Sequence, residues 1–404
     1  MELLRSAPKP ERAILMNTDP RRPIHVLTLT PFYPSRNDDG SGCFVSQPLA
    51  WLAKVGVRNT VFAVQPFYRG RLRGSDSAVP ADWLRHFALP GGFGLPIAGA
   101  FVFGRIVGRL RALHRLQRID VIHAHESLPC GHAAMLLSKE LGIPYVVSVR
   151  GLDAFSTMQV MGRAGTWCRR ISRRVYASSR RVICVSESVR EQVLEGMGRS
   201  CRTSVVYNGV DTKLFSPSDE PSSESTVILS VGNLLSSKGP DLLVRAASSL
   251  ASEFPALRWE FIGHGPERSR LQNLAQQLGV DACVRFLGRQ PRQQVARAMR
   301  RCTVFALPSR YEGLGSVYLE AMSTSKPIIG CRGQGIAEII RHGSNGFLVG
   351  PDNEKELTLA IAMLLRDESC RRNLGMAARD TILDRLTLAH QAESLARIYR
   401  ESIA

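Results

Sequence analysis

The sequence predicts an α/β protein of two doubly wound, Rossmann-like domains that face each other across a central cleft. The chain has 404 residues, about the length of two ordinary domains. In each half, short runs rich in Val and Ile alternate with amphipathic stretches of helical length, which is typical of parallel sheets covered by helices. Residues 216–225, SPSDEPSSES, contain no apolar residue and separate the two halves. Because parallel sheets bind ligands at the carboxyl ends of their strands, we expect a ligand between the domains.

The first half is expected to contain six strands, most of them bounded by Gly, Pro or Asp. They span Ile24–Phe32, Val57–Val64, Asp120–His125, Tyr145–Gly151, Arg181–Ser186 and Ser204–Gly209. The helices expected between them span Val45–Val55, Ile97–Gln117, Gly131–Leu141, Gly165–Ser178 and Ser188–Glu195.

The second half repeats this alternation, with helices between its strands and two more after the last strand. The expected strands are Val227–Gly232, Leu257–Gly263, Val284–Gly288, Thr303–Pro308, Pro327–Cys331 and Gly346–Val349. The chain is therefore expected to divide into a flexible tail (1–22), a first domain (23–212), a linker (213–225), a second domain (226–380) and a C-terminal helix (381–404) that packs back on the first domain.

Composition excludes several classes of protein. Hydrophobic residues make up 44% of the chain and charged residues 22%, which is ordinary for a globular protein and excludes disorder of the whole chain. No run of 18 apolar residues predicts a transmembrane helix, and Met1–Pro23 lacks the apolar core of a secretory signal. The nine Cys form no CxxC pair, which favours reduced thiols over a disulfide framework or a zinc site. We therefore expect a cytoplasmic protein with no metal.

The positive charge of the chain lies in its first half. The net charge is +18, and residues 1–210 hold 29 Lys and Arg against 14 Asp and Glu, whereas the rest holds 24 against 21. Residues 104–118, GRIVGRLRALHRLQR, predict a basic amphipathic helix. This pattern indicates an anionic partner, and we expect the protein on the inner face of the cell membrane. The alternatives are an Arg-rich composition bias and an ordinary helix that covers the core.

The clearest candidate ligand site is Pro308–Met322, PSRYEGLGSVYLEAM, in which a strand leads through a Gly-bearing turn into a helix. The start of a helix suits a phosphate group, and Gly313 and Gly315 permit its close approach to the backbone. Glu320, about one turn into the helix, can accept hydrogen bonds from ribose hydroxyls, and Glu312 can reach a sugar on the other side of a diphosphate. The alternatives are that Glu312 is a solvated charge in the loop and that Glu320 is a residue on the helix surface.

Two further loops follow strands of the second half. Residues 230–239 end in Lys238-Gly239, and Lys238 is one of only seven Lys in a chain that prefers Arg. A Lys at such a turn suits a diphosphate, although the order of a P-loop is absent. Residues 263–266, GHGP, are too short a pattern to indicate nucleotide binding alone.

In their order along the chain, these runs resemble the retaining GT-B glycosyltransferases of family 4, and the likeness spans residues 24–366. Matching runs of the second half are Val231-Gly232, Lys238-Gly239, Gly263–Pro266, Val284–Gly288, Leu307–Ser309, Glu312 with Glu320–Met322, and Gly346–Val349. Matching runs of the first half are Pro31–Val45, Asp120–His125, Pro144–Asp153, Cys184–Ser186 and Tyr207–Asp211.

The resemblance implies a donor site in the second domain and chemistry that needs no metal. Glu320 would hold the ribose, Lys238 would neutralise the leaving diphosphate, and Glu312 would position the donor sugar. Lys238, Glu312 and His123 are the expected catalytic residues. The expected donor-binding residues are Gly42, Asn233, Lys238, His264, Glu312, Gly313, Leu314, Gly315, Ser316, Val317 and Glu320.

Two positions depart from the family pattern. Asn233 stands where the family often has Arg, and residues 150–153, RGLD, stand where it often has His-Gly-x-x-Asp. Arg150 cannot act as a base, but it can bind phosphate and partly replace the missing Arg; pairing with Asp153 is the alternative. His125, Arg150 and Asp153 are expected on the acceptor or phosphate side. His123 and His125 are expected on opposite faces of their strand, and each has the alternative of a satisfied core histidine.

The implied activity is transfer of a sugar from a nucleotide-sugar to a polyprenyl-linked or growing polysaccharide acceptor in cell-surface glycan biosynthesis. No cofactor is expected. A UDP-sugar is the favoured co-substrate and GDP-mannose the second. The alternatives are a GT-B phosphorylase or epimerase, and a basic nucleic-acid-binding protein. Aromatic residues make up only 7% of the chain and no known nucleic-acid module is visible, so no nucleic-acid partner is expected.

Overall fold

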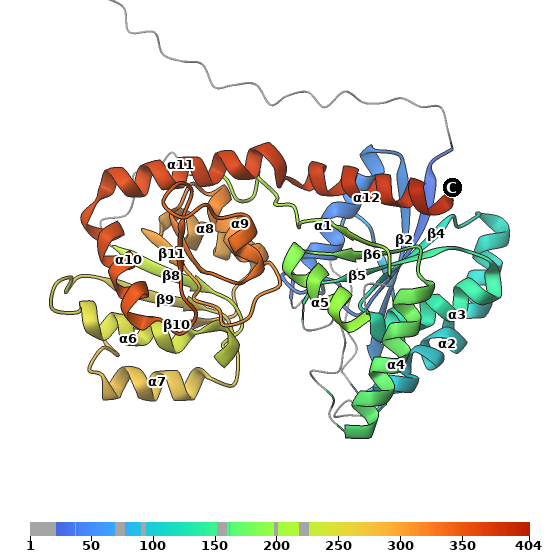
Figure 1. Cartoon of the computed structure of the whole chain (residues 1–404), viewed down its shortest axis with the longest axis horizontal. Coiled ribbons are helices and arrows are strands. Elements are labelled where there is room, and N and C mark those ends of the chain that lie inside the picture. The colour runs from blue at the N-terminus through green and yellow to red at the C-terminus, as the bar shows by residue number, and fades with distance from the viewer. Residues whose placement is uncertain are drawn as a thin grey trace, which may run out of the picture.

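Two parallel sheets covered by helices form two domains that lie side by side (Figure 1). The computed structural model describes residues 22–36, 38–68, 77–89, 94–151, 160, 162–197, 201–217 and 226–404. Nearly all of the tail expected at 1–22, most of the linker expected at 213–225, and Asp153 lie outside the described residues. The two doubly wound α/β domains predicted from the alternating pattern are confirmed.

The first sheet has seven parallel strands in the order β3-β2-β1-β4-β5-β6-β7. Its strands are β1 (Ile24–Thr30), β2 (Val57–Pro66), β3 (Ala81–His86), β4 (Val121–His125), β5 (Tyr145–Val149), β6 (Arg181–Cys184) and β7 (Thr203–Val205). The prediction missed β3, which pairs in parallel with β2 at the edge of the sheet. This strand is half-buried and carries Asp82 and Arg85, so it lacks the apolar run by which the inner strands were found.

Helices cover both faces of this sheet. They are α1 (Cys43–Lys54), α2 (Leu95–Leu116), α3 (His132–Leu141), α4 (Gly162–Ser178) and α5 (Glu187–Met197). In α2, Ile106 and Leu110 are fully buried in the core, while Leu116 at the helix end is 83% exposed. The apolar stripe of this basic helix therefore packs on the sheet of its own domain.

The second sheet has six parallel strands in the order β10-β9-β8-β11-β12-β13. They are β8 (Val227–Val231), β9 (Arg258–Ile262), β10 (Val284–Gly288), β11 (Val304–Ala306), β12 (Ile328–Cys331) and β13 (Phe347–Val349). The helices between them are α6 (Pro240–Leu250), α7 (Arg268–Gln277), α8 (Arg292–Arg301) and α9 (Ser316–Ser323), with short 3-10 turns η3 (Ser236–Lys238) and η4 (Gly335–Glu338).

Three helices follow the last strand, where two were expected: α10 (Glu354–Arg366), α11 (Glu368–Arg385) and α12 (Leu388–Ile403). The chain crosses from α11 on the second domain to α12 on the first, at the top of Figure 1. There Leu395, Ile398 and Tyr399 of α12 join the apolar cluster formed by α1 and the first sheet. None of the described helices is long and apolar enough to cross a bilayer.

Candidate functional site

The candidate residues follow the strands at which the strand order of each sheet reverses. In the first sheet, β1 lies between β2 and β4, and in the second sheet β8 lies between β9 and β11. Loops that leave the carboxyl ends of two such neighbouring strands diverge to opposite faces, so a crevice opens between them. Gly42 lies in the loop after β1, Lys238 in the loop after β8, and Glu312 in the loop after β11. The topology thus places the candidate loops at two crevices.

Gly42 closes the loop after β1 directly before α1. Its φ of 74° lies in the left-handed region, and a Cβ added there would be 2.5 Å from the backbone nitrogen of Tyr33. Only glycine fits this position without moving the loop. Gly42 therefore sets the path by which residues 38–43 reach the second domain, where Asp38 pairs with Arg289.

In the second domain, Lys238 and Glu312 form an ion pair between the loops after β8 and β11. Gln334 fixes the backbone around Glu312. The backbone N–H of Glu312 donates to Oε1 of Gln334 at 2.8 Å, and Nε2 of Gln334 donates to the carbonyl of Arg310 at 3.0 Å. The two loops also touch directly, since a Cβ on Gly239 would be 2.1 Å from the carbonyl oxygen of Pro308. This packing fixes a cation and a carboxylate at one place.

The start of α9 lies between Glu312 and the first domain. Its N-cap, Gly315, has a φ of 75° and provides no side-chain cap, so the first amide groups of the helix lack a capping side chain. Ser316 Oγ accepts a hydrogen bond of 2.9 Å from Nδ2 of Asn208, whose Oδ1 accepts one of 2.8 Å from Nη1 of Arg150. A chain of polar contacts therefore links Arg150 of the first domain to the start of α9.

At Gly313 the backbone of the second domain lies directly against the backbone of the first, because a Cβ on Gly313 would be 2.0 Å from the carbonyl oxygen of Arg150. Within the second domain, a Cβ on Gly335 would be 1.8 Å from the carbonyl oxygen of Gly313. Leu314 is buried in the core, so it can offer only its backbone to a ligand, whereas Val317 packs against the core and stays partly exposed. The segment 313–317 thus contacts the first domain, through the backbone at Gly313 and through the side chain at Ser316.

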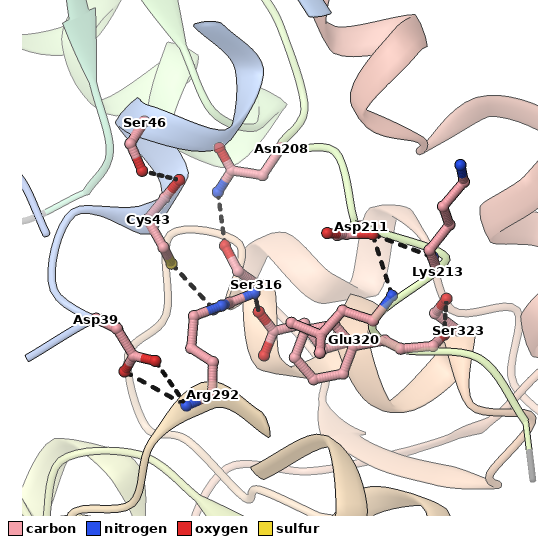
Figure 2. A network of polar contacts seen from close by, with 12 residues as sticks. Asp39, Cys43, Ser46, Asn208, Asp211, Lys213, Arg292, Ser316, Glu320 and Ser323 are labelled. Carbon is pink, nitrogen blue, oxygen red and sulfur yellow. Dashed lines mark hydrogen bonds and ion pairs between the residues drawn. The ribbon is translucent and has the colours of Figure 1, made fainter. Parts of the chain in front are cut away.

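Glu320 is buried within α9, with 6% of its surface exposed, and its charged partner is Arg292 at the start of α8. Nη2 of Arg292 lies 3.0 Å from Oε1 of Glu320, and Nη1 donates to Sγ of Cys43 at 3.1 Å. Figure 2 shows the Arg292 side chain between Cys43 and Glu320, with Asp39 beside the backbone of Arg292. Burial raises the pKa of Glu320, and Arg292 opposes that shift.

The two histidines of β4 share one face of the strand, which corrects the expectation of opposite faces. Their ring centroids lie 4.4 Å apart and the rings are stacked. Side chains at positions i and i+2 of a strand point the same way, and only consecutive ones alternate. In His123, Nδ1 is 2.7 Å from the Tyr399 hydroxyl and Nε2 is 2.7 Å from Oγ of Ser148, so both ring nitrogens have partners. Burial, together with the nearby charge of Arg150, lowers the pKa of His123 to about 3.

His125 differs from His123 in having a buried nitrogen, Nδ1, that makes no hydrogen bond with the described residues. Burial lowers its pKa well below the ordinary value. The ring lines a pocket between β4, α1 and α12, to which Arg150, Asn208 and Tyr399 also contribute. About 20 Å³ of this pocket is open to the centres of water molecules, enough for one water or for the end of a small polar group.

Asn233 follows β8 and His264 follows β9, and both residues are exposed. Their loops pack together, because a Cβ on Gly263 would be 1.8 Å from the carbonyl oxygen of Gly232, and the amide of Leu234 donates to the carbonyl of His264 at 3.0 Å. The GHG run therefore serves close packing of two loops. Within the described ranges, no three side chains of His, Cys, Asp or Glu are grouped so that they could hold a metal ion.

Several residues of this region were missed from the sequence. Asn208 lay in a run that was noted only for its resemblance, and Arg292 was not noted at all. A Pro followed by Arg at the start of a helix was the only local sign of Arg292. Glu338 was also missed: its carboxylate accepts hydrogen bonds of 2.8 Å from the amides of Glu187 and Ser188 in the first domain.

Two family profiles match the chain. Residues 44–214 match "Glycosyltransferase Family 4" and residues 212–381 match "Glycosyl transferases group 1". An uncharacterised glycosyltransferase from Methanocaldococcus jannaschii is 32% identical over 259 residues, which cover 64% of this chain and 68% of that protein. A D-inositol 3-phosphate glycosyltransferase from Acidothermus cellulolyticus is 29% identical over 323 residues, which cover 75% of this chain and 71% of that protein.

Solved structures share the fold. HepE from Anabaena, in complex with UDP-glucose, superposes with a TM-score of 0.72 at 20% identity, and the match covers 93% of this chain and 98% of that one. The division into two parallel-sheet domains is therefore common to both proteins.

Proposed function

Because the chain belongs to the group 1 glycosyltransferases of family 4, a retaining family with the GT-B fold, we propose that it transfers a sugar from a UDP-sugar to a polyprenyl-linked or growing polysaccharide acceptor at the cytoplasmic face of the membrane. GDP-mannose is the second candidate donor. The family assignment favours a glycosyltransferase over the phosphorylase, epimerase and nucleic-acid-binding alternatives. The UDP-glucose bound to the Anabaena relative supports a uridine nucleotide.

One observation carries the proposed donor site: Lys238, Glu312 and the uncapped start of α9 converge at one place in the second domain, opposite Arg150. When the bond between the sugar and the diphosphate breaks, negative charge grows on the diphosphate. A Lys and the amides at a helix start stabilise such charge where it develops. In this proposal Glu312 positions the sugar and Glu320 holds the ribose.

The proposal assigns the substrate-facing role on β4 to His125 in place of His123. His123 is enclosed by Tyr399 and Ser148, with both ring nitrogens bonded, so it supports its neighbour from the core. Both histidines line the pocket beside Arg150, but only His125 has a ring nitrogen without a hydrogen-bond partner among the described residues. Arg150 is the candidate phosphate ligand that takes over from the Arg replaced by Asn233.

Donor use is tested by measuring nucleotide release from a panel of UDP-, GDP- and ADP-sugars, with and without a lipid extract. Thermal unfolding with free UDP, GDP and ADP gives an independent measurement, because a nucleotide that binds only the folded state raises the melting temperature. We expect UDP to give the largest shift. If none of the three nucleotides changes the melting temperature or is released from its sugar, the donor-site proposal is wrong.

The proposed membrane surface is the exposed face of α4 with part of α2. Neither helix contains Asp or Glu. In α2, Arg109 pairs with Asp82 and Arg111 pairs with Glu140, so these two charges are partly neutralised. In α4, five exposed Arg side chains have no acidic partner among the described residues: Arg163, Arg169, Arg170, Arg173 and Arg174. Trp167 on the same helix is 52% exposed, and Trp suits the interface of a bilayer.

Vesicle sedimentation tests this surface. Each Arg near an anionic bilayer contributes on the order of 1 kcal/mol, so wild-type protein should sediment with anionic vesicles at low salt but not with neutral ones. Binding should fade at 1 M salt, where the screening length is about 3 Å. The triple change Arg163→Gln, Arg170→Gln and Arg174→Gln should abolish sedimentation and leave turnover of a soluble acceptor intact.

The matched control removes the same charge from the exposed residues Arg366, Arg372 and Arg397 of the C-terminal helices. If this control loses vesicle binding as fully as the α4 variant, or if wild-type protein stays in the supernatant, the α4 surface is not a docking site.

A further inference from the structure

Arg292 occupies a buried position where the two domains meet. It is the first residue of α8 in the second domain, and only 14% of its side chain is exposed. From the first domain, the Asp39 carboxylate accepts from its backbone N–H at 3.2 Å and Cys43 Sγ accepts from Nη1 at 3.1 Å. Its guanidinium lies over the ring of Phe215, 5.1 Å from the ring centroid. Asp39 therefore holds the backbone of Arg292, while Cys43 and Phe215 contact its side chain; Figure 2 shows the polar contacts.

Arg292 touches the residue to which the proposed function assigns the ribose. Glu320 lies inside α9 with 8% of its side chain exposed, and Arg292 is its charged partner at 3.0 Å. An ionised carboxylate is costly to bury unless a cation compensates it. Only an ionised carboxylate offers both oxygens as acceptors to a pair of hydroxyl groups. The charge state and orientation of Glu320 thus matter for ribose binding.

We propose that Arg292 is a positioning residue of the nucleotide site: it keeps the buried Glu320 carboxylate ionised and oriented for the ribose hydroxyls, and contacts from the first domain hold it there. This inference rests on the proposed function, because it takes Glu320 as the ribose ligand. Nε of Arg292 is buried and has no acceptor among the described residues. A hydroxyl oxygen of a bound ribose gives this donor a partner.

Few other charged groups face Glu320. Cys43 of α1 lies on the far side of Arg292, and burial raises its pKa to about 11, so it stays a neutral thiol. Asp39 binds the backbone of Arg292. On α11, Arg379 binds the carbonyl of Ser323 at the other end of α9, and Cys331 of β12 faces Tyr318. Arg292 is therefore the group whose removal should change how Glu320 titrates.

The direction in which the pKa of Glu320 changes when Arg292 is lost follows from burial. Burial already raises the pKa of Glu320 and Arg292 opposes it, so loss of Arg292 moves the pKa further upward. As pH falls below the raised pKa, a smaller fraction of Glu320 is ionised. One pH unit below a pKa, about one tenth of a group remains ionised, so an affinity that needs the carboxylate falls about tenfold.

The experiment measures the Kd of UDP by calorimetry at pH 8, 7 and 6 for wild-type protein, Arg292→Gln and Arg292→Lys. The ratio of each variant's Kd to the wild-type Kd cancels the titration of UDP itself. For Arg292→Gln we expect this ratio to grow as pH falls from 8 to 6, by up to about tenfold for each pH unit below the raised pKa of Glu320. For Arg292→Lys, which keeps a cation, the ratio should not change with pH. Circular dichroism and the melting temperature check that each variant is folded.

Two further variants separate the causes. Arg289→Gln removes the ion pair between Arg289 and Asp38 but leaves Arg292 in place. The ratio of its Kd to the wild-type Kd should therefore not change with pH. Glu320→Gln cannot ionise, so adding Arg292→Gln to it should introduce no pH dependence.

A ratio for Arg292→Gln that is constant with pH would overturn the inference, as would an equal pH dependence in Arg292→Lys. Either result would mean that Arg292 only fills space. If wild-type protein binds neither UDP nor GDP, the proposed function fails and the inference fails with it. If wild-type protein binds UDP and Glu320→Ala does not, a flat ratio overturns the role of Arg292 alone.

Discussion

Replacing Gly313 by alanine is expected to separate the two domains without disturbing either of them. The Cβ of alanine would be 2.0 Å from the carbonyl oxygen of Arg150, and its next neighbours are also first-domain backbone atoms of Arg150 and Gly151. Real Cβ atoms do not approach closer than 3.0 Å, so the contact must open by at least about 1 Å. Misplacement of reacting groups by about 1 Å can lower a rate 100-fold.

We therefore expect kcat/KM of Gly313→Ala to fall about 100-fold, while the Kd of UDP changes less than about threefold. The reason for the difference is that the proposed nucleotide contacts, apart from Gly42 and Arg150, lie in the second domain, whereas the acceptor side lies in the first. Steady-state kinetics with a soluble acceptor and calorimetry with UDP, on the same preparation, measure the two quantities.

Gly108→Ala is the matched control. Gly108 lies on an exposed side of α2 with no atom within 4 Å of an added Cβ, so this variant should keep wild-type kinetics. Two results would refute the reasoning on Gly313. One is a kcat/KM within threefold of wild type, and the other is a loss of UDP affinity as large as the loss of kcat/KM.

Three other predictions concern charge and protonation. Lys238→Ala and Glu320→Ala should each lower turnover by about 30- to 1000-fold while both variants still fold, as circular dichroism would show; near-normal turnover of both would contradict the donor site. Treatment with EDTA should leave most activity intact, because Lys238 and the start of α9 stand where a metal would supply positive charge. Full loss of activity that magnesium or manganese restores would contradict this. Burial lowers the pKa of His123 to about 3 and that of His125 well below 6.5, so below pH 6.5 the unfolded state binds protons that the folded state does not. The unfolding free energy should then drop as pH falls from 6.5 toward 3, by about 1.4 kcal/mol per pH unit for His123, with a contribution of the same sign from His125; urea titrations that give equal stability at pH 7 and pH 5 would count against it.

Local pattern was sufficient for most of the secondary structure. The inner strands of both sheets are mostly buried, and such strands appear in a sequence as short runs of Val and Ile between Gly, Pro and Asp. The half-buried edge strand β3 has no such run, and it was the strand that the pattern missed. The turn glycines and the order of the loops were also readable, because a left-handed or crowded turn restricts which residue can occupy it.

The sequence by itself thus determined the two α/β domains, the loops that carry Gly42, Lys238 and Glu312, and the helix that carries Glu320. The tertiary structure decided which side chains meet. His123 binds Tyr399, 276 residues away, and Arg292 reaches both Cys43 and Glu320 from a different helix. Periodicity reports only which face of an element is buried. The partner found on that face depends on how sheets and domains pack, which is a property of the whole chain and has no local signal.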